Sequence, residues 1–327
     1  MRLGSVALLL AFGSACSMNA AQLSPSLPSV SSGTRWLNGQ SDGSQSLPAF
    51  SKKQRLLYVA ASNAIKIYDV GVRHPKLVAT LTKEIGTPSN PCLSRDGTLY
   101  VPSVRGGVAG FIVVYPFGHS SPSEVLPAIG PGEPRGCAVD SDGNLWVADV
   151  YLNEVYEYVK GQNTIGTIIY GIPCPDSVAF DATGNMYVAV FGFFCPRAAV
   201  EIFAPAKTLP FKTISISKFA PFIDIAIDPR GKLYIADLQY VLVYDLGVEK
   251  FAKKLTNGTV GVGAVAVDGR GRLYAGGNLE ERRQRRDKSH IVEFAPGATA
   301  PGSVRIRTKG KANFINGLAA WPPSELR

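Results

Sequence analysis

Charged residues are scarce in this 327-residue chain, which has 18% Asp, Glu, Lys and Arg against 46% hydrophobic residues. A disordered protein shows the opposite balance, so the composition predicts a folded chain with a large core. The chain also lacks an apolar run of about 20 residues, the length that a helix needs to span a bilayer. We therefore expect a globular protein without a transmembrane helix.

Histidine is scarce too, and the common catalytic motifs are missing. The three histidines, His74, His119 and His290, lie in or beside predicted outer loops, so a histidine-based triad has little support. Neither a G-x-S-x-G elbow nor an H-E-x-x-H pair occurs. The net charge of +9 gives weak support for an acidic partner, and we expect no binding to nucleic acid.

The first 21 residues have the pattern of a secretory signal peptide. Arg2 precedes the apolar run 6–12, which is followed by small residues up to Ala21. This order predicts export to the periplasm or the extracellular space. Residues 13–16 also resemble a bacterial lipoprotein signal, in which Cys16 would carry a lipid and provide the one expected link to a membrane. The Ser/Pro/Gly-rich residues 22–49 would form a linker.

An apolar–aromatic–apolar triplet recurs six times, with its aromatic residue at positions 58, 100, 146, 187, 234 and 274. The spacings are 42, 46, 41, 47 and 40 residues. In four copies an apolar strand ends at Asp and Gly follows after two residues, which is typical of a tight hairpin. A third and a fourth strand follow each triplet. Four strands in each repeat of roughly 40–45 residues predict β-propeller blades.

The two ends of the repeat region complement each other. The first copy lacks a first strand, whereas residues 315–321 form a first strand with nothing after it. Pairing the two would complete a sixth blade and remove the exposed sheet edges. Alanine at one register of the first strand suits a crowded axis: Ala138, Ala179, Ala226, Ala266 and Ala319. We predict an all-β fold, a six-bladed propeller of four-stranded blades at residues 50–322, with a tail at 323–327.

Repeats such as residues 175–189 resemble those of NHL-repeat proteins and of the SMP-30/gluconolactonase-like six-bladed propellers. The resemblance covers nearly all of the mature chain. It implies a site at the channel mouth, where lactonases of this family hold a divalent metal such as Ca²⁺ or Mg²⁺. Asp176 resembles the family's catalytic Asp, and Asn316 resembles the Asn of its metal-binding Asn-Gly-Leu-Ala segment.

Three further residues share the repeat register of that mouth and are candidates for ligand binding: Asn90, Arg135 and Asp224. The chain departs from the family because no Glu begins a first strand to complete the metal set. The alternative for Asp176 and Asn316 is therefore that they hold loops by hydrogen bonds to the backbone.

The four cysteines after the signal suit an oxidising compartment. We predict the disulfides Cys174–Cys195 and Cys92–Cys137, with buried free thiols as the alternative for the second pair. Two loops stand out by composition. The loop at 191–196, with Phe193 and Phe194, would hold an apolar ligand or pack over the channel mouth. The loop at 280–288, with Arg283 and Arg285, would meet anionic lipid or polysaccharide, or stay solvated.

These features favour an exported, monomeric and non-catalytic binding module without a cofactor. Its ligand, glycan or protein partner would bind on the loop face. The competing hypothesis is a metal-dependent lactone or ester hydrolase of the SMP-30/gluconolactonase type that acts through Asp176 and Asn316. A third hypothesis is a surface-anchored interaction module, which depends on lipidation of Cys16.

Overall fold

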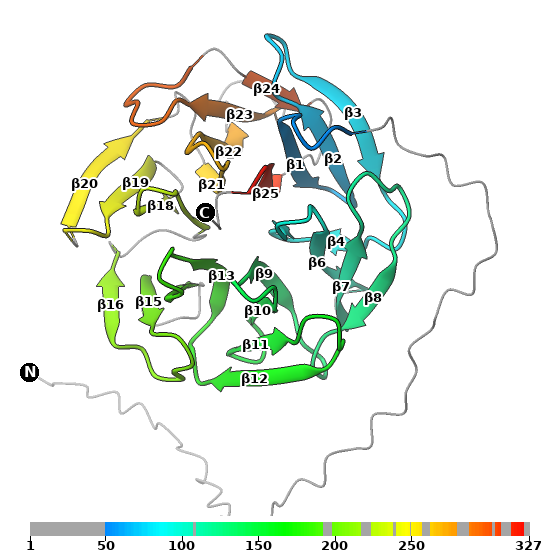
Figure 1. Ribbon diagram of the computed structural model, residues 1–327, viewed down its shortest axis with the longest axis vertical. Helices are drawn as coiled ribbons and strands as arrows, with labels where there is room; N and C mark the ends of the chain where they lie inside the picture. The colour runs from blue at the N-terminus through cyan, green and yellow to red at the C-terminus, as the bar shows by residue number, and fades with distance from the viewer. Residues whose placement is uncertain are drawn as a thin grey trace, which may run out of the picture. The chain divides into compact units, whose positions relative to one another are not determined.

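The computed structural model describes residues 50–323, apart from 107–108, 192–197, 217–223, 238–239, 249, 257–261, 280–287, 303–304 and 309–314. The described residues form β-strands and turns, and the predicted all-β class is confirmed. Among them no helix has the length and hydropathy needed to cross a bilayer. Figure 1 shows six sheets arranged as a ring around a central axis.

Four blades follow the chain order, with the first strand innermost and the fourth at the rim. Their strands are β9 (Pro134–Val139), β10 (Leu145–Asp149), β11 (Glu154–Tyr158) and β12 (Ile165–Tyr170); β13 (Pro175–Phe180), β14 (Met186–Val190), β15 (Ala199–Phe203) and β16 (Lys212–Ser215); β17 (Ile225–Ile227), β18 (Lys232–Asp237), β19 (Tyr240–Asp245) and β20 (Lys250–Leu255); and β21 (Val262–Val267), β22 (Leu273–Leu279), β23 (Lys288–Phe294) and β24 (Arg305–Thr308).

The ring closes by pairing of the chain ends, as the repeat arithmetic predicts. The closing blade consists of β25 (Ile315–Trp321), β1 (Leu56–Ala61), β2 (Ala64–Asp69) and β3 (Lys76–Leu81). Strand β25 pairs antiparallel with β1, so that Leu57 lies opposite Ala320. In Figure 1 the red C-terminal strand lies beside the dark blue N-terminal one.

The remaining blade departs from the four-stranded pattern because its first strand is broken. Strands β4 (Thr87–Pro88) and β5 (Cys92–Leu93) both pair with β6 (Leu99–Arg105), and β7 (Ala109–Tyr115) and β8 (Glu124–Pro127) complete the sheet. Pro91 lies in the gap and has no backbone N–H for a ladder hydrogen bond. At the gap, Asn90 instead forms an isolated bridge to Gly136 of the next blade.

The four Asp turns form as the sequence predicts, and in three of them the Asp also has a second role. In the β13–β14 turn, Asp181 Oδ1 accepts the backbone N–H groups of Thr183 and Asn185, both at 2.9 Å. Its other oxygen accepts the hydroxyl of Tyr187, the aromatic residue of the triplet, at 3.1 Å. Asp140 with Trp146 and Asp228 with Tyr234 repeat this arrangement. The carboxylate therefore fixes both the turn and the aromatic ring.

The core lies between the blades rather than within them. Six clusters of buried apolar side chains fill the spaces between neighbouring blades in the described part of the chain. The cluster around Leu56 and Leu99 joins the closing blade to the β4–β8 blade, and the one around Leu57 and Tyr274 joins it to the β21–β24 blade. Apolar burial thus continues around the whole ring.

Candidate functional site

The innermost strands all begin at one end of the central channel, and we call this end the channel mouth. Because consecutive strands are antiparallel, the connections from second to third strands and from fourth to first strands reach the same face. The residues predicted for the site occupy these strand starts, one in each of five blades: Asn90, Arg135, Asp176, Asp224 and Asn316.

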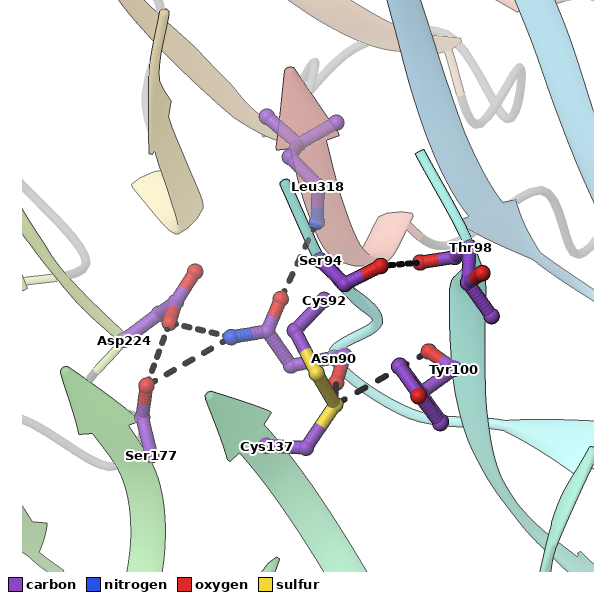
Figure 2. The surroundings of a disulfide bond; sticks show 9 residues. All are labelled: Asn90, Cys92, Ser94, Thr98, Tyr100, Cys137, Ser177, Asp224 and Leu318. Atoms are coloured by element: carbon purple, nitrogen blue, oxygen red, sulfur yellow. Dashed lines mark hydrogen bonds between the residues drawn. A yellow bond between two sulfur atoms is a disulfide. The ribbon is translucent and has the colours of Figure 1, made fainter. Parts of the chain in front are cut away.

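Three polar side chains meet across the channel mouth, as Figure 2 shows. The amide Nδ2 of Asn90 donates to Asp224 Oδ1 at 2.5 Å and lies 3.4 Å from Ser177 Oγ. The Ser177 hydroxyl donates to the same Asp224 oxygen at 2.8 Å. On the other side, Asn90 Oδ1 accepts the backbone N–H of Leu318 at 3.1 Å. One asparagine thus links four blades.

The Asp224 carboxylate is saturated by donors from its own chain. Besides Asn90 and Ser177, its oxygens accept the backbone N–H groups of Ile225 at 2.9 Å and Val265 at 2.8 Å. The pKa of Asp224 is raised to about 7. Burial raises it most and the nearby charge of Asp176 adds to this effect, whereas the hydrogen bonds from Val265, Ser177 and Ile225 lower it. The carboxylate that lies nearest the axis is therefore engaged in holding the blades together.

The channel below these residues is too narrow for a substrate. It has a volume of about 60 Å³, room for roughly two water molecules. Alanines line part of it, among them Ala226, Ala266 and Ala319, which agrees with the crowded axis that the sequence predicts. The backbones also approach closely, since a Cβ on Gly317 would lie 2.3 Å from Asn90 Cα.

The side chains of Arg135 and Asn316 have partners outside this cluster, although the Arg135 carbonyl oxygen accepts the backbone N–H of Asn90 at 2.9 Å. Arg135 forms an ion pair with Glu133 at 2.8 Å, and both side chains are half-exposed. Asn316 is exposed, and its Nδ2 donates to the carbonyl oxygen of Pro88 at 2.9 Å. This hydrogen bond matches the loop-holding alternative for Asn316. Asp176 is half-buried at the mouth, close enough for its charge to act on Asp224.

No group of three or more His, Cys, Asp or Glu side chains is suited to hold a metal within the described ranges. Two glutamates from other loops pair with arginines: Glu133 with Arg135 at 2.8 Å, and Glu84 with Arg105 at 3.2 Å. The catalytic and metal roles expected for Asp176 and Asn316 therefore stay predictions.

The predicted disulfide Cys92–Cys137 is confirmed. It joins β5 to β9 beside Asn90, with the two Cα atoms 5.6 Å apart (Figure 2). Both cysteines are buried, and the bond is consistent with an oxidising compartment. Cys174 also takes part in a disulfide, while Cys195, its predicted partner, lies outside the described residues.

Several predicted residues lie outside the described ranges: Cys16, Phe193, Phe194, Arg283 and Arg285. The aromatic and basic loops to which four of them belong connect β14 to β15 and β22 to β23, which places both connections on the face of the channel mouth. His290, which the sequence places beside a loop, lies within β23 and is buried.

Sequence reasoning missed a groove on the opposite face. It has a volume of about 350 Å³ and lies between the β13–β16 and β17–β20 blades, where Tyr187, Phe211 and Tyr244 contribute aromatic rings. Asp181 and Asp245 add carboxylates to its lining. Its size falls within the range of small-ligand pockets. The signal for it is the exposed aromatic Phe211 at the start of a rim strand.

No family model matches the chain, and no curated protein matches its sequence. Solved structures match by fold. A crystal structure of a protein of unknown function from Bacteroides caccae has a TM-score of 0.63 and 14% identity, covering 82% of this chain and 98% of that chain. Kuenenia stuttgartiensis hydrazine synthase has a TM-score of 0.51 and 16% identity, covering 72% of this chain and 70% of that chain. At these identities the likeness supports the β-propeller fold alone.

Proposed function

We propose that the protein is an exported, non-catalytic binding module that holds its ligand on the face of the channel mouth. The observation that carries the proposal is the saturation of Asp224, which accepts hydrogen bonds from Asn90, Ser177, Ile225 and Val265. A carboxylate that already accepts from four donors is poorly placed to bind a metal. The polar groups of the axis thus stabilise the ring, and recognition falls to the surrounding loops.

The two faces of the ring differ in a way that supports this placement. On the opposite face, the turns after β9, β13, β17 and β21 share one Asp-x-x-Gly pattern. On the face of the channel mouth the connections vary: β1 and β2 are joined by residues 62–63 alone, whereas β14 and β15 are joined by residues 191–198. Variable loops on a rigid scaffold are the usual place for binding.

An anionic glycan is the ligand that we propose. The chain carries a net charge of +9, and its segment 280–288 contains five basic residues among nine. Such a charge balance attracts polyanions over a distance set by the salt concentration. In the exported environment that the signal sequence predicts, acidic polysaccharides are polyanions of this kind.

The resemblance of the repeats to NHL and SMP-30/gluconolactonase-like propellers rests on residues such as 175–189. It supports the competing hypothesis of a metal-dependent lactone or ester hydrolase. That hypothesis requires Asp176 and Asn316 to hold a metal with at least one further strong oxygen ligand. The two hypotheses therefore predict different results for one set of variants.

The test combines binding with turnover. Alginate and neutral dextran are titrated against the protein in low and high salt, and lactone and aryl-ester hydrolysis is followed with Ca²⁺, Mg²⁺, Mn²⁺ or Zn²⁺. We expect salt-sensitive binding to alginate that weakens at least fivefold when Arg283 and Arg285 are both changed to Ala. The matched control is Phe211→Ala in the groove of the opposite face, which should bind as the wild type does.

Three results would overturn the proposal. Metal-dependent hydrolysis that is lost in both Asp176→Ala and Asn316→Ala would establish the enzyme instead. Loss of alginate binding in Phe211→Ala alone would move the binding surface to the opposite face. Equal binding to alginate and dextran would refute the anionic ligand.

A further inference from the structure

The β9–β12 blade buries two carboxylates on adjacent strands. Asp149 ends β10 with 0% of its surface exposed, and Glu154 begins β11 with 5% exposed. The two residues lie opposite each other in the antiparallel ladder, so their side chains project from the same face of the sheet. Cβ atoms in such pairs are about 5 Å apart.

The fold itself does not need charges at this position. In the β13–β16 blade the equivalent cross-strand pair is Val190 with Ala199, and both are fully buried. In the closing blade it is Ala61 with Ala64, which are buried as well. A pair of acids where two other blades have aliphatic residues therefore calls for a separate physical reason.

Each carboxylate has an oxygen that no described residue satisfies. Asp149 Oδ1 accepts the backbone N–H groups of Glu133 at 2.9 Å and of Tyr151 and Leu152, both at 3.1 Å. By contrast, the buried atoms Asp149 Oδ2 and Glu154 Oε1 have no hydrogen-bond partner within the described part of the chain. Burial raises the pKa of both groups, and the charge of Asp149 adds to the effect on Glu154.

A third polar side chain, that of Tyr156, is buried on the same face of the sheet as the two acids. Tyr156 follows Glu154 by two residues on β11, hence on the same face, and its side chain is fully buried. Its hydroxyl has no side-chain partner among the described residues, and the backbone of Ile129 lies close to it. Burial raises the pKa of the Tyr156 phenol well above its ordinary value, and the nearby charges of Asp149 and Glu154 contribute.

The connection from β8 to β9 brings a backbone carbonyl close to Asp149. A Cβ built on Gly132 would lie 2.1 Å from Asp149 Oδ2 and 3.0 Å from the carbonyl oxygen of Ile129. The carboxylate and carbonyl oxygens therefore converge beside a residue that only glycine can occupy. The nearby cation Arg135 is committed to Glu133 at 2.8 Å.

We propose that Asp149 and Glu154 form a calcium site within the β9–β12 blade. Buried carboxylates without a counter-charge cost several kcal/mol each, and buried polar atoms without partners point to an ion that satisfies them. Two carboxylates balance the charge of one divalent cation. The candidate ligands are all oxygens, whereas structural zinc sites use the sulfur of Cys and the nitrogen of His.

Ca²⁺ suits this arrangement better than Mg²⁺ does. It accepts carboxylate, backbone carbonyl and water oxygens in flexible geometry, whereas Mg²⁺ requires a near-ideal octahedron and gives up water reluctantly. Asp149 Oδ2, Glu154 Oε1 and the Ile129 carbonyl would supply protein ligands, and the Tyr156 hydroxyl would orient a bound water. Asp149 and Glu154 lie on the second and third strands of their blade, outward from the innermost strand, and the site does not depend on the proposed ligand.

The test is calcium titration of the chelator-treated protein by calorimetry, with thermal unfolding as a second readout. We expect one Ca²⁺ per chain, with a dissociation constant of roughly 10⁻⁴–10⁻³ M, the range of extracellular modules, and weaker binding of Mg²⁺. Glu154→Gln should weaken Ca²⁺ binding at least tenfold. The matched control is Glu157→Gln, on the same strand but the other face, where the side chain accepts the N–H of Thr167.

Asp149→Asn serves as a second variant, because its amide oxygen can still accept the backbone N–H groups that Asp149 holds. Both variants should unfold at the wild-type temperature or above it in EDTA, since each removes a buried negative charge. The proposal fails if the wild type binds no Ca²⁺ up to about 10 mM, or if Glu154→Gln binds it as tightly as the wild type. Loss of Ca²⁺ binding in Asp176→Ala rather than in Glu154→Gln would place the ion at the channel mouth and overturn the proposal.

Discussion

Ring closure is reinforced by a buried arginine, and its replacement is the sharpest test of the fold. Arg55 precedes β1 in the closing blade, yet its guanidinium contacts the β21–β24 blade. It donates to Tyr274 Oη at 2.6 Å and to Glu293 Oε2 at 2.9 Å, and it lies 3.6 Å from Asp268 Oδ2. The side chains of Arg55 and Asp268 are 16% and 1% exposed. Arg55 therefore joins two blades that meet at the seam of the ring.

The destabilisation expected for Arg55→Met depends on the partners that Asp268 and Glu293 keep. Asp268 keeps the two backbone N–H groups of its turn, but its Oδ2 loses the nearby cation. Glu293 keeps Arg272 at 3.2 Å. Removing one partner of a buried ion pair costs about 3–5 kcal/mol. Because Asp268 and Glu293 keep other partners, we expect Arg55→Met to lower the free energy of unfolding by about 3 kcal/mol. That change is roughly a hundredfold in the unfolding equilibrium.

Urea unfolding at pH 7 measures this change, because a shift in the midpoint at constant slope reports stability alone. Arg105→Met is the matched control. Its ion pair with Glu84 lies at the surface, with side chains 61% and 38% exposed, and such pairs contribute less than about 1 kcal/mol. If Arg55→Met destabilises the protein no more than Arg105→Met does, the closure does not depend on this cluster.

Two further predictions concern the axis. Gly317→Ala should destabilise the protein by about 1–3 kcal/mol in thermal unfolding, because the new Cβ would lie 2.3 Å from Asn90 Cα. The control Gly263→Ala should be nearly neutral, because no atom lies within 4 Å of its Cβ. Equal effects of the two variants would refute close packing at the axis. Burial raises the folded-state pKa of Asp224 to about 7, above an unfolded value near 4. Between these two pH values the native state therefore binds more protons than the unfolded state does. The free energy of unfolding should accordingly fall as the pH rises from about 4 to 7. Urea titrations at pH 5, 6 and 7 should show this slope in the wild type and a flatter one in Asp224→Asn; the same slope in both would assign it to other groups.

Local rules predicted the blades because each blade is a local structure. The hairpins form between residues close in sequence, and the Asp-x-x-Gly pattern specifies the turn by itself, as in Asp181 and Gly184. The closure of the ring was predicted by counting the strands at the two ends of the repeat region. The same rules missed the break in the first strand of the β4–β8 blade, although Pro91 marks it.

The site was less predictable because its contacts join distant parts of the chain. Asn90 and Asp224 are separated by 134 residues, and Ser177 reads as an ordinary strand residue until the ring brings the three together. Repeat register placed Asn90 and Asp224 at the same mouth, but it did not show that they bind each other. For the acidic pair the available signal was comparison between blades, since Asp149 and Glu154 stand where the next blade has Val190 and Ala199.

The two ends of the innermost strands point to different physical demands on this chain. At one end, four blades use the same Asp to build the turn, and in three of them, as Asp140 and Asp228 illustrate, it also holds an aromatic ring. At the other end, the five strand starts named above carry Asn, Arg or Asp, and the side chains of Asn90 and Asp224 bind each other. A scaffold that needed only stability would satisfy both ends in the same way. The variation therefore favours the channel-mouth face as the place of recognition, with the polar cluster as its rigid base.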